Sequence, residues 1–204
     1  MNIDKAIKHL KKVDPKMKVL VKKYGHPNFK PIDDYYESLV RSIVYQQLST
    51  KAAQTIFNRF KDLFNEKLFP TPEKVFDIND QKLMSVGLSG QKVKYIKDLS
   101  NKWPRIEKKL LNINKMTDQE IRNILLDVKG IGRWTVDMFL IFSLMREDVF
   151  PSGDLAIQKG FCILNDLDSK PSIDEINESS KLWKPYRTIA SWYLWKLIDG
   201  QTEW

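Results

Sequence analysis

The chain has 204 residues, 42% of them hydrophobic and 29% charged, a balance that excludes a disordered chain and fits one compact domain or two small lobes. Cys162 is the single cysteine, which excludes disulfide frameworks, cysteine-rich zinc sites and four-cysteine iron–sulfur clusters and favours a reducing intracellular compartment. The lysine-rich N-terminal segment has no apolar centre, and nowhere do about 18 apolar residues run together, so we expect neither a signal peptide nor a membrane span.

The net charge of +8 is concentrated in two parts of the chain. Residues 1–30 carry nine Lys against two acidic residues, and residues 82–133 carry 12 basic against five acidic residues. Clustered basic charge suits a polyanion such as nucleic acid, because each neutralised phosphate releases a counterion. A solvated lysine-rich surface is the alternative explanation.

Apolar residues recur at helical spacing along almost the whole chain, and no convincing run alternates as a strand would. Capping boxes are predicted where Thr117 precedes Glu120 and where Ser172 precedes Glu175. In chain order, helices are predicted over residues 3–24 with a break near Pro15, over 35–47 and over 50–64. One helix is then predicted to begin at Pro72, and a later short helix to stop at Gly87. Further helices are predicted over 92–103, 118–127, 134–145, 154–164, from 172 onwards, and 185–198. The pattern is typical of a globular all-α protein with tight connections.

One break between two predicted helices has the form of a glycine hairpin, Gly130-Ile131-Gly132, flanked by Lys129 and Arg133. Two glycines permit a tight turn that another chain can approach closely. Backbone N–H groups at a helix N-terminus, together with the helix dipole, form a good phosphate site. An ordinary αα-hairpin, in which the glycines only supply the bend, is the alternative.

Around this hairpin the sequence resembles the helix-hairpin-helix DNA glycosylase superfamily, and several further motifs resemble its DNA-3-methyladenine glycosylase II branch. Together the matches extend over about residues 35–198 and occur in the family's order. The matching segments are residues 42–49 (SIVYQQLS), 69–72 (FPTP), 125–135 (LLDVKGIGRWT), 149–154 (VFPSGD) and 183–187 (WKPYR).

The resemblance implies a two-lobed helical core with the active site in a cleft between the lobes. We expect this chain to lack the N-terminal sheet domain that some members have. We expect a helical lobe over residues 35–146, which carries the hairpin, and a second helical lobe made of residues 1–34 and 147–204.

Asp154 occupies the position of the family's catalytic aspartate. It precedes an apolar helix, whose dipole favours an ionised carboxylate there. Cleavage of an N-glycosidic bond builds positive charge on the sugar, which a fixed anion stabilises, and the same carboxylate could activate the attacking water. A plain N-cap role is the alternative for Asp154. Asp137 and Asp148 are nearby carboxylates outside the motif position.

The resemblance also assigns roles in recognising the base. Bifunctional relatives carry a Schiff-base lysine where this chain has Trp134, so we expect hydrolysis without lyase chemistry. Trp134 and Trp195 match aromatic pocket positions, and Tyr45 is a weaker candidate; packing in the core is the alternative for all three. Gln47 lies nearest the position of the DNA wedge, with Leu48 as its neighbour, and a polar helix-to-helix loop is the alternative.

The sequence therefore predicts a monofunctional DNA glycosylase that flips alkylated purines, such as 3-methyladenine or 7-methylguanine, out of double-stranded DNA and hydrolyses them off to leave an abasic site. The alternative is a noncatalytic protein that binds damaged DNA. We expect a monomer without an organic cofactor or a side-chain metal site, in the cytoplasm of a bacterium or archaeon or in a eukaryotic nucleus. The resemblance implies one optional ion, Na⁺ or K⁺, at the backbone carbonyls of the hairpin.

Overall fold

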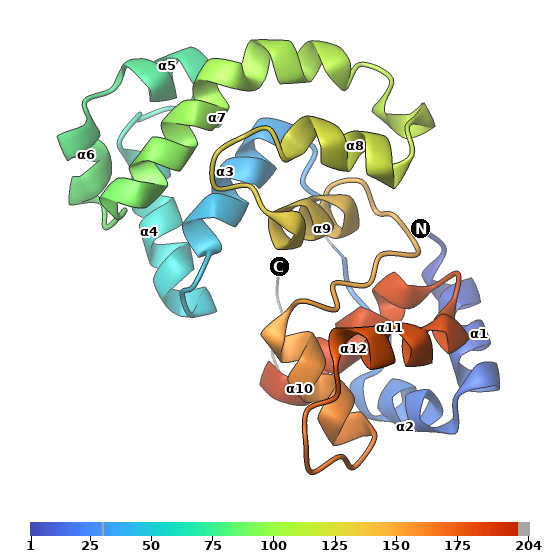
Figure 1. Ribbon diagram of the computed structural model, residues 1–204. Helices are drawn as coiled ribbons and strands as arrows, with labels where there is room; N and C mark the ends of the chain where they lie inside the picture. The colour runs from blue at the N-terminus through green and yellow to red at the C-terminus, as the bar shows by residue number, and fades with distance from the viewer. Residues whose placement is uncertain (30, 200–204) are drawn as a thin grey trace. The chain divides into compact units, whose positions relative to one another are not determined.

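The computed structural model describes residues 1–29 and 31–199, and within these residues it contains twelve α-helices, two short 3₁₀ helices and no strand (Figure 1). The predicted all-α fold is thereby confirmed. Residue 30 and residues 200–204, which the sequence assigns to the second predicted lobe, lie outside the described residues.

The chain divides into two compact units. Unit 1 comprises residues 1–31 and 140–204, and unit 2 comprises residues 32–139. The boundaries between the predicted lobes follow residues 34 and 146, whereas the boundaries between the units follow residues 31 and 139. The hairpin belongs to unit 2, and Asp154 belongs to unit 1.

Unit 1 is built around its last helix. α12 (Arg187–Asp199) buries Ile189, Ala190 and Tyr193 completely. α10 packs so closely on α12 that a Cβ on Gly160 would lie 2.5 Å from the carbonyl oxygen of Leu194, which requires glycine there. The other helices of unit 1 are α1 (Ile3–Val13), α2 (Pro15–Tyr24), α10 (Leu155–Leu164), α11 (Ile173–Ser179) and the 3₁₀ helix η2 (Ser180–Trp183).

Unit 2 packs its helices around a core of aliphatic and aromatic side chains that includes Leu39, Phe60 and Leu99, all fully buried. The longest helix, α7, lies against α5 and α6 (Figure 1). The helices of unit 2 are α3 (Tyr35–Tyr45), α4 (Thr50–Asp62), α5 (Pro72–Asp77), α6 (Asp80–Ser85), α7 (Gly90–Lys109), the 3₁₀ helix η1 (Ile113–Lys115), α8 (Asp118–Leu125) and α9 (Arg133–Phe142), of which residues 140–142 belong to unit 1.

Local capping signals place most helix starts correctly, whereas two helix ends differ from the prediction by three residues or more. Both predicted capping boxes form, at Thr117 and at Ser172. α7 does not end at Trp103 but continues through Pro104 to Lys109, because the buried Trp103 and Ile106 keep the helix packed on the core. α9 ends at Phe142, earlier than predicted, and Met145 beyond it has a left-handed φ of 52°.

Candidate functional site

The two glycines of the hairpin between α8 and α9 lie in different surroundings. Gly130 has a φ of 80°, and a Cβ there would lie 2.1 Å from the ring of Tyr95. The fold therefore requires glycine at this position. Gly132 is exposed, and a Cβ there would meet no atom within 4 Å. Its backbone therefore remains open to a ligand.

The remaining residues of the hairpin divide into an anchor and two exposed cations. Ile131 is 5% exposed and fixes the turn in the core, while Lys129 and Arg133 are exposed on either side of it. The Lys129 N–H donates to Asp98 Oδ2 over 2.8 Å. Burial raises the pKa of Asp98, but this hydrogen bond and the ammonium group of Lys102 lower it by more, so that it stays below its ordinary value.

An ion pair joins the two helices of the hairpin. Arg122 on α8 contacts Asp137 on α9, with 2.6 Å between guanidinium nitrogen and carboxylate oxygen. Burial raises the pKa of Asp137 more than the charge of Arg122 lowers it. Asp137 is 9% exposed, so its carboxylate stabilises the hairpin through this ion pair and does not face an open site.

The predicted wedge follows α3 as an exposed turn. Gln47 is exposed and has a left-handed φ of 57°, and Leu48 is 40% exposed. The side-chain amide of Gln46 donates from Nε2 to the carbonyl oxygen of Gly130 over 2.8 Å. The structure thus brings the predicted wedge and the hairpin together.

The aromatic candidates differ in exposure. Tyr45 is 6% exposed and donates its hydroxyl to Gln54 Oε1 over 2.5 Å, with the guanidinium group of Arg41 4.8 Å from its ring centre. Burial raises the pKa of Tyr45. Trp134, in the first turn of α9, is half-buried. Their pocket roles stay predictions, and the burial of Tyr45 favours its packing role.

Asp154 is the N-cap residue of α10. Its Oδ1 accepts hydrogen bonds from the N–H groups of Ala156 at 2.8 Å and Ile157 at 2.9 Å. The indole Nε1–H of Trp195, on α12, donates to the same oxygen over 3.4 Å. Asp154 is half-buried, so the carboxylate is held by three N–H donors while solvent still reaches the residue.

Trp195 reaches Asp154 from a buried position. It is 2% exposed and stacks on Phe142, with ring centres 5.9 Å apart and planes 29° apart. Two residues that the sequence assigned separately, the carboxylate and one aromatic side chain, therefore lie together in unit 1.

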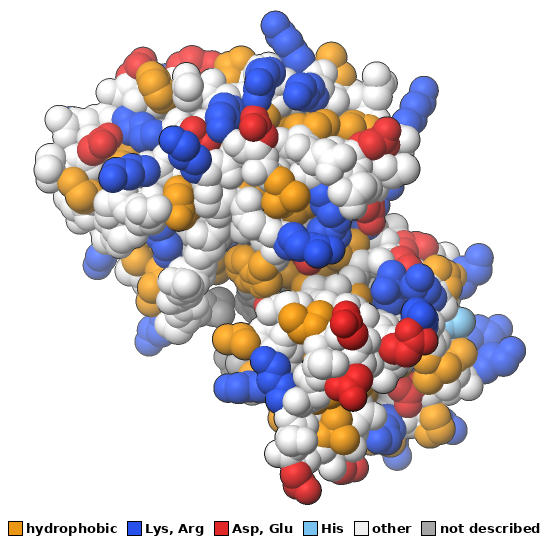
Figure 2. Space-filling view, viewed as in Figure 1, with side chains coloured by type: hydrophobic (Ala, Val, Ile, Leu, Met, Phe, Trp, Pro, Cys, Tyr) orange, Lys and Arg blue, Asp and Glu red, His pale blue; other side chains and the backbone are white. Residues whose placement is uncertain are grey.

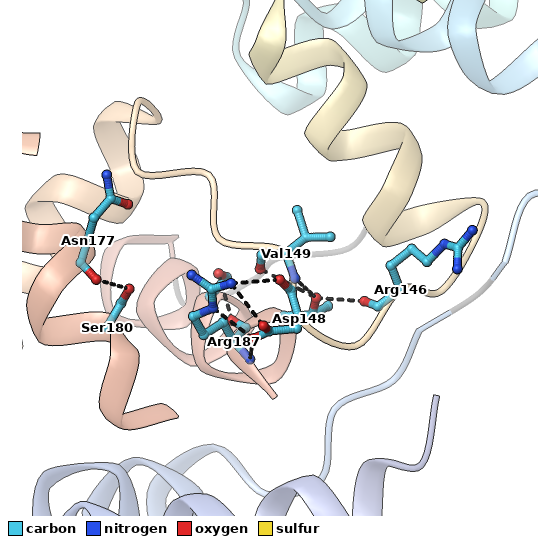
Figure 3. A network of polar contacts seen from close by, with 8 residues as sticks. Arg146, Asp148, Val149, Asn177, Ser180 and Arg187 are labelled. Atoms are coloured by element: carbon cyan, nitrogen blue, oxygen red, sulfur yellow. Dashed lines mark hydrogen bonds and ion pairs between the residues drawn. The ribbon is translucent and has the colours of Figure 1, made fainter. Parts of the chain in front are cut away.

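The loop that leads to Asp154 is tied to the start of α12 (Figure 3). Arg187 donates to Asp148 from Nε at 2.7 Å and from a terminal nitrogen at 2.9 Å. The Thr188 hydroxyl donates to the carbonyl oxygen of Arg146 over 2.7 Å and accepts from the N–H of Val149 over 3.0 Å. Arg187 of the WKPYR motif thus pairs with a carboxylate, and Asp148 is engaged in holding the loop.

Sequence patterns missed the long-range hydrogen bonds of two residues, Gln46 beside the predicted wedge and Lys92 on α7. Gln46 contacts a hairpin 84 residues away, and the Lys92 ammonium group contacts the carbonyl oxygen of Val44, 48 residues away. No local spacing indicates such long-range pairs. The cleft implied between the lobes stays a prediction.

The hairpin offers oxygen ligands to a monovalent cation only through its backbone. Carbonyl oxygens are suitable ligands for such hard cations, but those of Val128, Gly130 and Gly132 already accept hydrogen bonds. Among the described residues, no group of three His, Cys, Asp or Glu side chains could hold a metal ion. A search of the same residues finds no helix long and apolar enough to cross a membrane.

Comparison with known proteins relates this geometry to one family. The family model described as HhH-GPD superfamily base excision DNA repair protein matches residues 40–185. DNA-3-methyladenine glycosylase 1 of Schizosaccharomyces pombe is 38% identical over 205 residues, which cover 96% of this chain and 87% of the relative. The alkylbase DNA glycosidase-like protein mag2 of the same yeast is 34% identical, with 95% and 92% covered.

One solved structure is similar to this chain over nearly its whole length. It contains the Schizosaccharomyces pombe 3-methyladenine DNA glycosylase Mag1 in complex with abasic DNA. Its TM-score to this chain is 0.86 at 37% sequence identity, covering 98% of this chain and 100% of the other. The similarity therefore extends over nearly the whole chain.

Proposed function

Since the chain belongs to the HhH-GPD superfamily of base excision DNA repair proteins, we propose that it is a DNA glycosylase that excises alkylated purines from double-stranded DNA. Its similarity to glycosylases named for 3-methyladenine supports this substrate class. The observation that carries the proposal is the half-buried Asp154 carboxylate, fixed by α10 and by the Trp195 indole at the motif position of the catalytic aspartate.

Asp154 supplies the electrostatic part of the reaction. As the bond between base and deoxyribose breaks, positive charge develops on the sugar, and a carboxylate held in place stabilises this charge more in the transition state than in the ground state. The same carboxylate orients and deprotonates the attacking water. An N-alkylated purine already carries positive charge, so it leaves without strong help from a general acid.

The base must first leave the stack. We propose that the exposed pair Gln47 and Leu48 enters the duplex and takes the place of the everted nucleotide. The half-buried indole of Trp134 then provides an aromatic face for a cationic base, a contact worth roughly 0.5–2 kcal/mol, with Trp195 and Tyr45, which are 2% and 6% exposed, as the weaker candidates.

The hairpin holds the DNA backbone. We propose that the open backbone at Gly132 approaches a phosphate, with the exposed Lys129 and Arg133 on either side. Na⁺ or K⁺, if bound beside that phosphate, would use hairpin carbonyl oxygens and add positive charge. The protein would act as a monomer in a compartment that contains DNA, which is the cytoplasm of a prokaryote or the nucleus of a eukaryote.

The deciding experiment compares Asp154→Asn with the wild type on duplex DNA that carries one defined methylated purine. Asn keeps an oxygen that accepts the α10 N–H bonds, so the fold and DNA binding should change little, whereas single-turnover release of the base should fall by at least about a thousandfold. Asp148→Asn is the matched control, because it removes an aspartate charge from a structural pair and should affect stability more than release. Full activity of Asp154→Asn would refute the mechanism.

If the wild type binds the lesion DNA but releases no base in a single turnover, the noncatalytic alternative holds instead. We expect the wild type to bind the lesion DNA and release the base. We expect Asp154→Asn alone to lose release.

A further inference from the structure

The C-terminal end of α3 is held by a lysine from a different helix. Lys92, in the first turn of α7, donates from Nζ to the carbonyl oxygens of Val44 at 2.7 Å and Gln46 at 2.8 Å. The last carbonyls of a helix have no partner within the helix and carry the negative end of its dipole. The ammonium group therefore satisfies carbonyls at the point where α3 ends and the turn Gln47-Leu48 begins.

Lys92 occupies a place that its own helix disfavours. The N-terminal turn of α7 carries the positive end of the helix dipole, which repels a cation, and the side chain is half-buried. Burial also lowers the pKa of Lys92. The α3 carbonyls are what offset this unfavourable placement. Lys94, two residues later on α7, is exposed.

Gln46 ties the same turn to the hairpin. Its Nε2 donates to the carbonyl oxygen of Gly130 at 2.8 Å and to Thr135 Oγ1 at 3.1 Å. A side-chain amide has two N–H donors, so it can make both bonds at once. Gly130 lies in the hairpin turn, and Thr135 lies in the first turns of α9, 1% exposed. The turn and the hairpin are therefore joined by direct hydrogen bonds.

Next to the hydrogen bonds of Lys92 and Gln46, the backbone makes a sharp turn at Gln47 and Leu48. The Leu48 N–H donates to the carbonyl oxygen of Tyr45 over 3.3 Å, and Gln47 has its left-handed φ. A non-glycine residue persists in that conformation when its surroundings determine it. The side chains of Gln47 and Leu48 are nevertheless exposed. The backbone of the turn is fixed while its two side chains face solvent.

We propose that Lys92 and Gln46 are positioning residues for base eversion, which hold the turn Gln47-Leu48 in its penetrating geometry on the hairpin. The inference rests on the proposed function. A wedge that is already ordered replaces the lost stacking without ordering its own backbone during eversion. A turn released from Lys92 or Gln46 has to order while the base leaves, so the defect appears in eversion and not in bond cleavage.

The test measures single-turnover release from two duplexes that differ only opposite the lesion. In one the methylated purine faces its normal partner, and in the other it faces an abasic analogue, so eversion breaks no base pair and costs less. Lys92→Met should slow release from the paired duplex by about tenfold and from the unpaired duplex by less than about threefold. Lys92→Arg, which can donate to both carbonyls, should restore most of the paired rate.

Two control variants complete the test. Lys94→Met removes the same charge from the same helix, and it should change the rates of release from the two duplexes by an equal factor. Gln46→Met keeps the length of the side chain but removes the amide donors, and it should reproduce the selective loss of Lys92→Met. Because the readout is a ratio of two rates of the same folded protein, a general loss of stability does not imitate it.

Equal losses on both duplexes, or no loss in Lys92→Met and Gln46→Met, would overturn the inference. A readout without chemistry separates it from the proposed function. The fluorescence of 2-aminopurine placed beside the target reports unstacking when the protein binds. The rise in fluorescence should be smaller in Lys92→Met than in Lys94→Met, even if the wild type releases no base. An equal rise in both variants would also contradict the inference.

Discussion

Three aspartates in the C-terminal half of the chain show how surroundings divide the roles of one residue type. Asp137 is buried in an ion pair with Arg122, and Asp148 is bound by Arg187 at the root of a loop. Asp154 combines backbone N–H donors with partial exposure. The first two carboxylates stabilise protein elements, and the third is the one that we propose for stabilising a developing charge on the sugar.

Trp134 leads to a prediction about the class of reaction. A lyase mechanism needs an amine that attacks the sugar and forms a Schiff base, and an indole has no such nucleophile. We expect that incubation of the protein with abasic-site DNA and borohydride traps no covalent adduct, and that strand cleavage does not exceed the rate without protein. A trapped adduct would contradict hydrolysis as the sole chemistry and would show that an amine elsewhere in the chain is the nucleophile.

At the scale of elements, the hairpin separates a glycine that the fold needs from a glycine that a ligand needs. Gly130→Ala would place a methyl group inside the ring of Tyr95 at a left-handed φ. We expect it to lower the free energy of unfolding by about 2–4 kcal/mol, measured by urea denaturation.

Gly132→Ala is the matched substitution on the same turn. Because a Cβ there meets no protein atom, we expect a change in unfolding free energy within about 0.5 kcal/mol. Its DNA affinity should nevertheless fall, since the methyl group stands between backbone and phosphate. Unchanged affinity in a binding titration would contradict the phosphate site proposed at Gly132.

The ion pair between α8 and α9 leads to a prediction that depends on pH. Arg122→Met leaves the buried Asp137 carboxylate without its partner, so we expect a loss of about 3 kcal/mol in unfolding free energy at neutral pH. Burial already raises the pKa of Asp137, and removal of Arg122 raises it further. The folded variant thus holds the proton more tightly than the unfolded chain does. Lowering the pH protonates Asp137 in the variant. The difference in unfolding free energy between the variant and the wild type should therefore become smaller.

Denaturation curves of both proteins at neutral and mildly acidic pH test this prediction. A difference that stays constant or widens as the pH falls would show that Asp137 does not control the stability of the hairpin.

At the scale of the molecule, basic side chains gather on particular elements of the fold. Figure 2 shows Lys and Arg side chains gathered over α7, the helix that also supports the hairpin through Tyr95 and Asp98. Several lysines of unit 2 are paired within the fold, among them Lys97 with Asp80 and Lys102 with Asp98. The exposed Lys129 and Arg133 therefore stand out as cations presented beside an open backbone.

This charge pattern predicts binding that depends on salt. If four phosphates are neutralised, affinity for a short duplex should fall about a hundredfold between about 50 and about 200 mM salt. Lys129→Met and Arg133→Met should each reduce the slope of log affinity against log salt by about one. An affinity independent of salt would favour the alternative in which the basic segments only keep the protein soluble.

The order and approximate bounds of the helices follow from local patterns. Thr117, Ser172 and Asp154 cap helices because each capping hydrogen bond joins residues two or three positions apart, which spacing alone reveals. The hairpin and the motif aspartate were likewise recognisable in the linear chain. The continuation of α7 through Pro104 was not, because packing on the core outweighs the local preference of proline.

The linear chain was thus enough to establish an all-helical fold, the family and the candidate carboxylate, because these depend on composition, periodicity and short motifs. It could not show that Trp195 donates to Asp154, that Gly130 rather than Gly132 is sterically required, or that Lys92 and Gln46 fasten the turn after α3. Each of these features joins atoms from segments far apart in the chain. Such contacts arise only when the helices pack, since packing and not sequence distance decides which groups come within reach of a hydrogen bond.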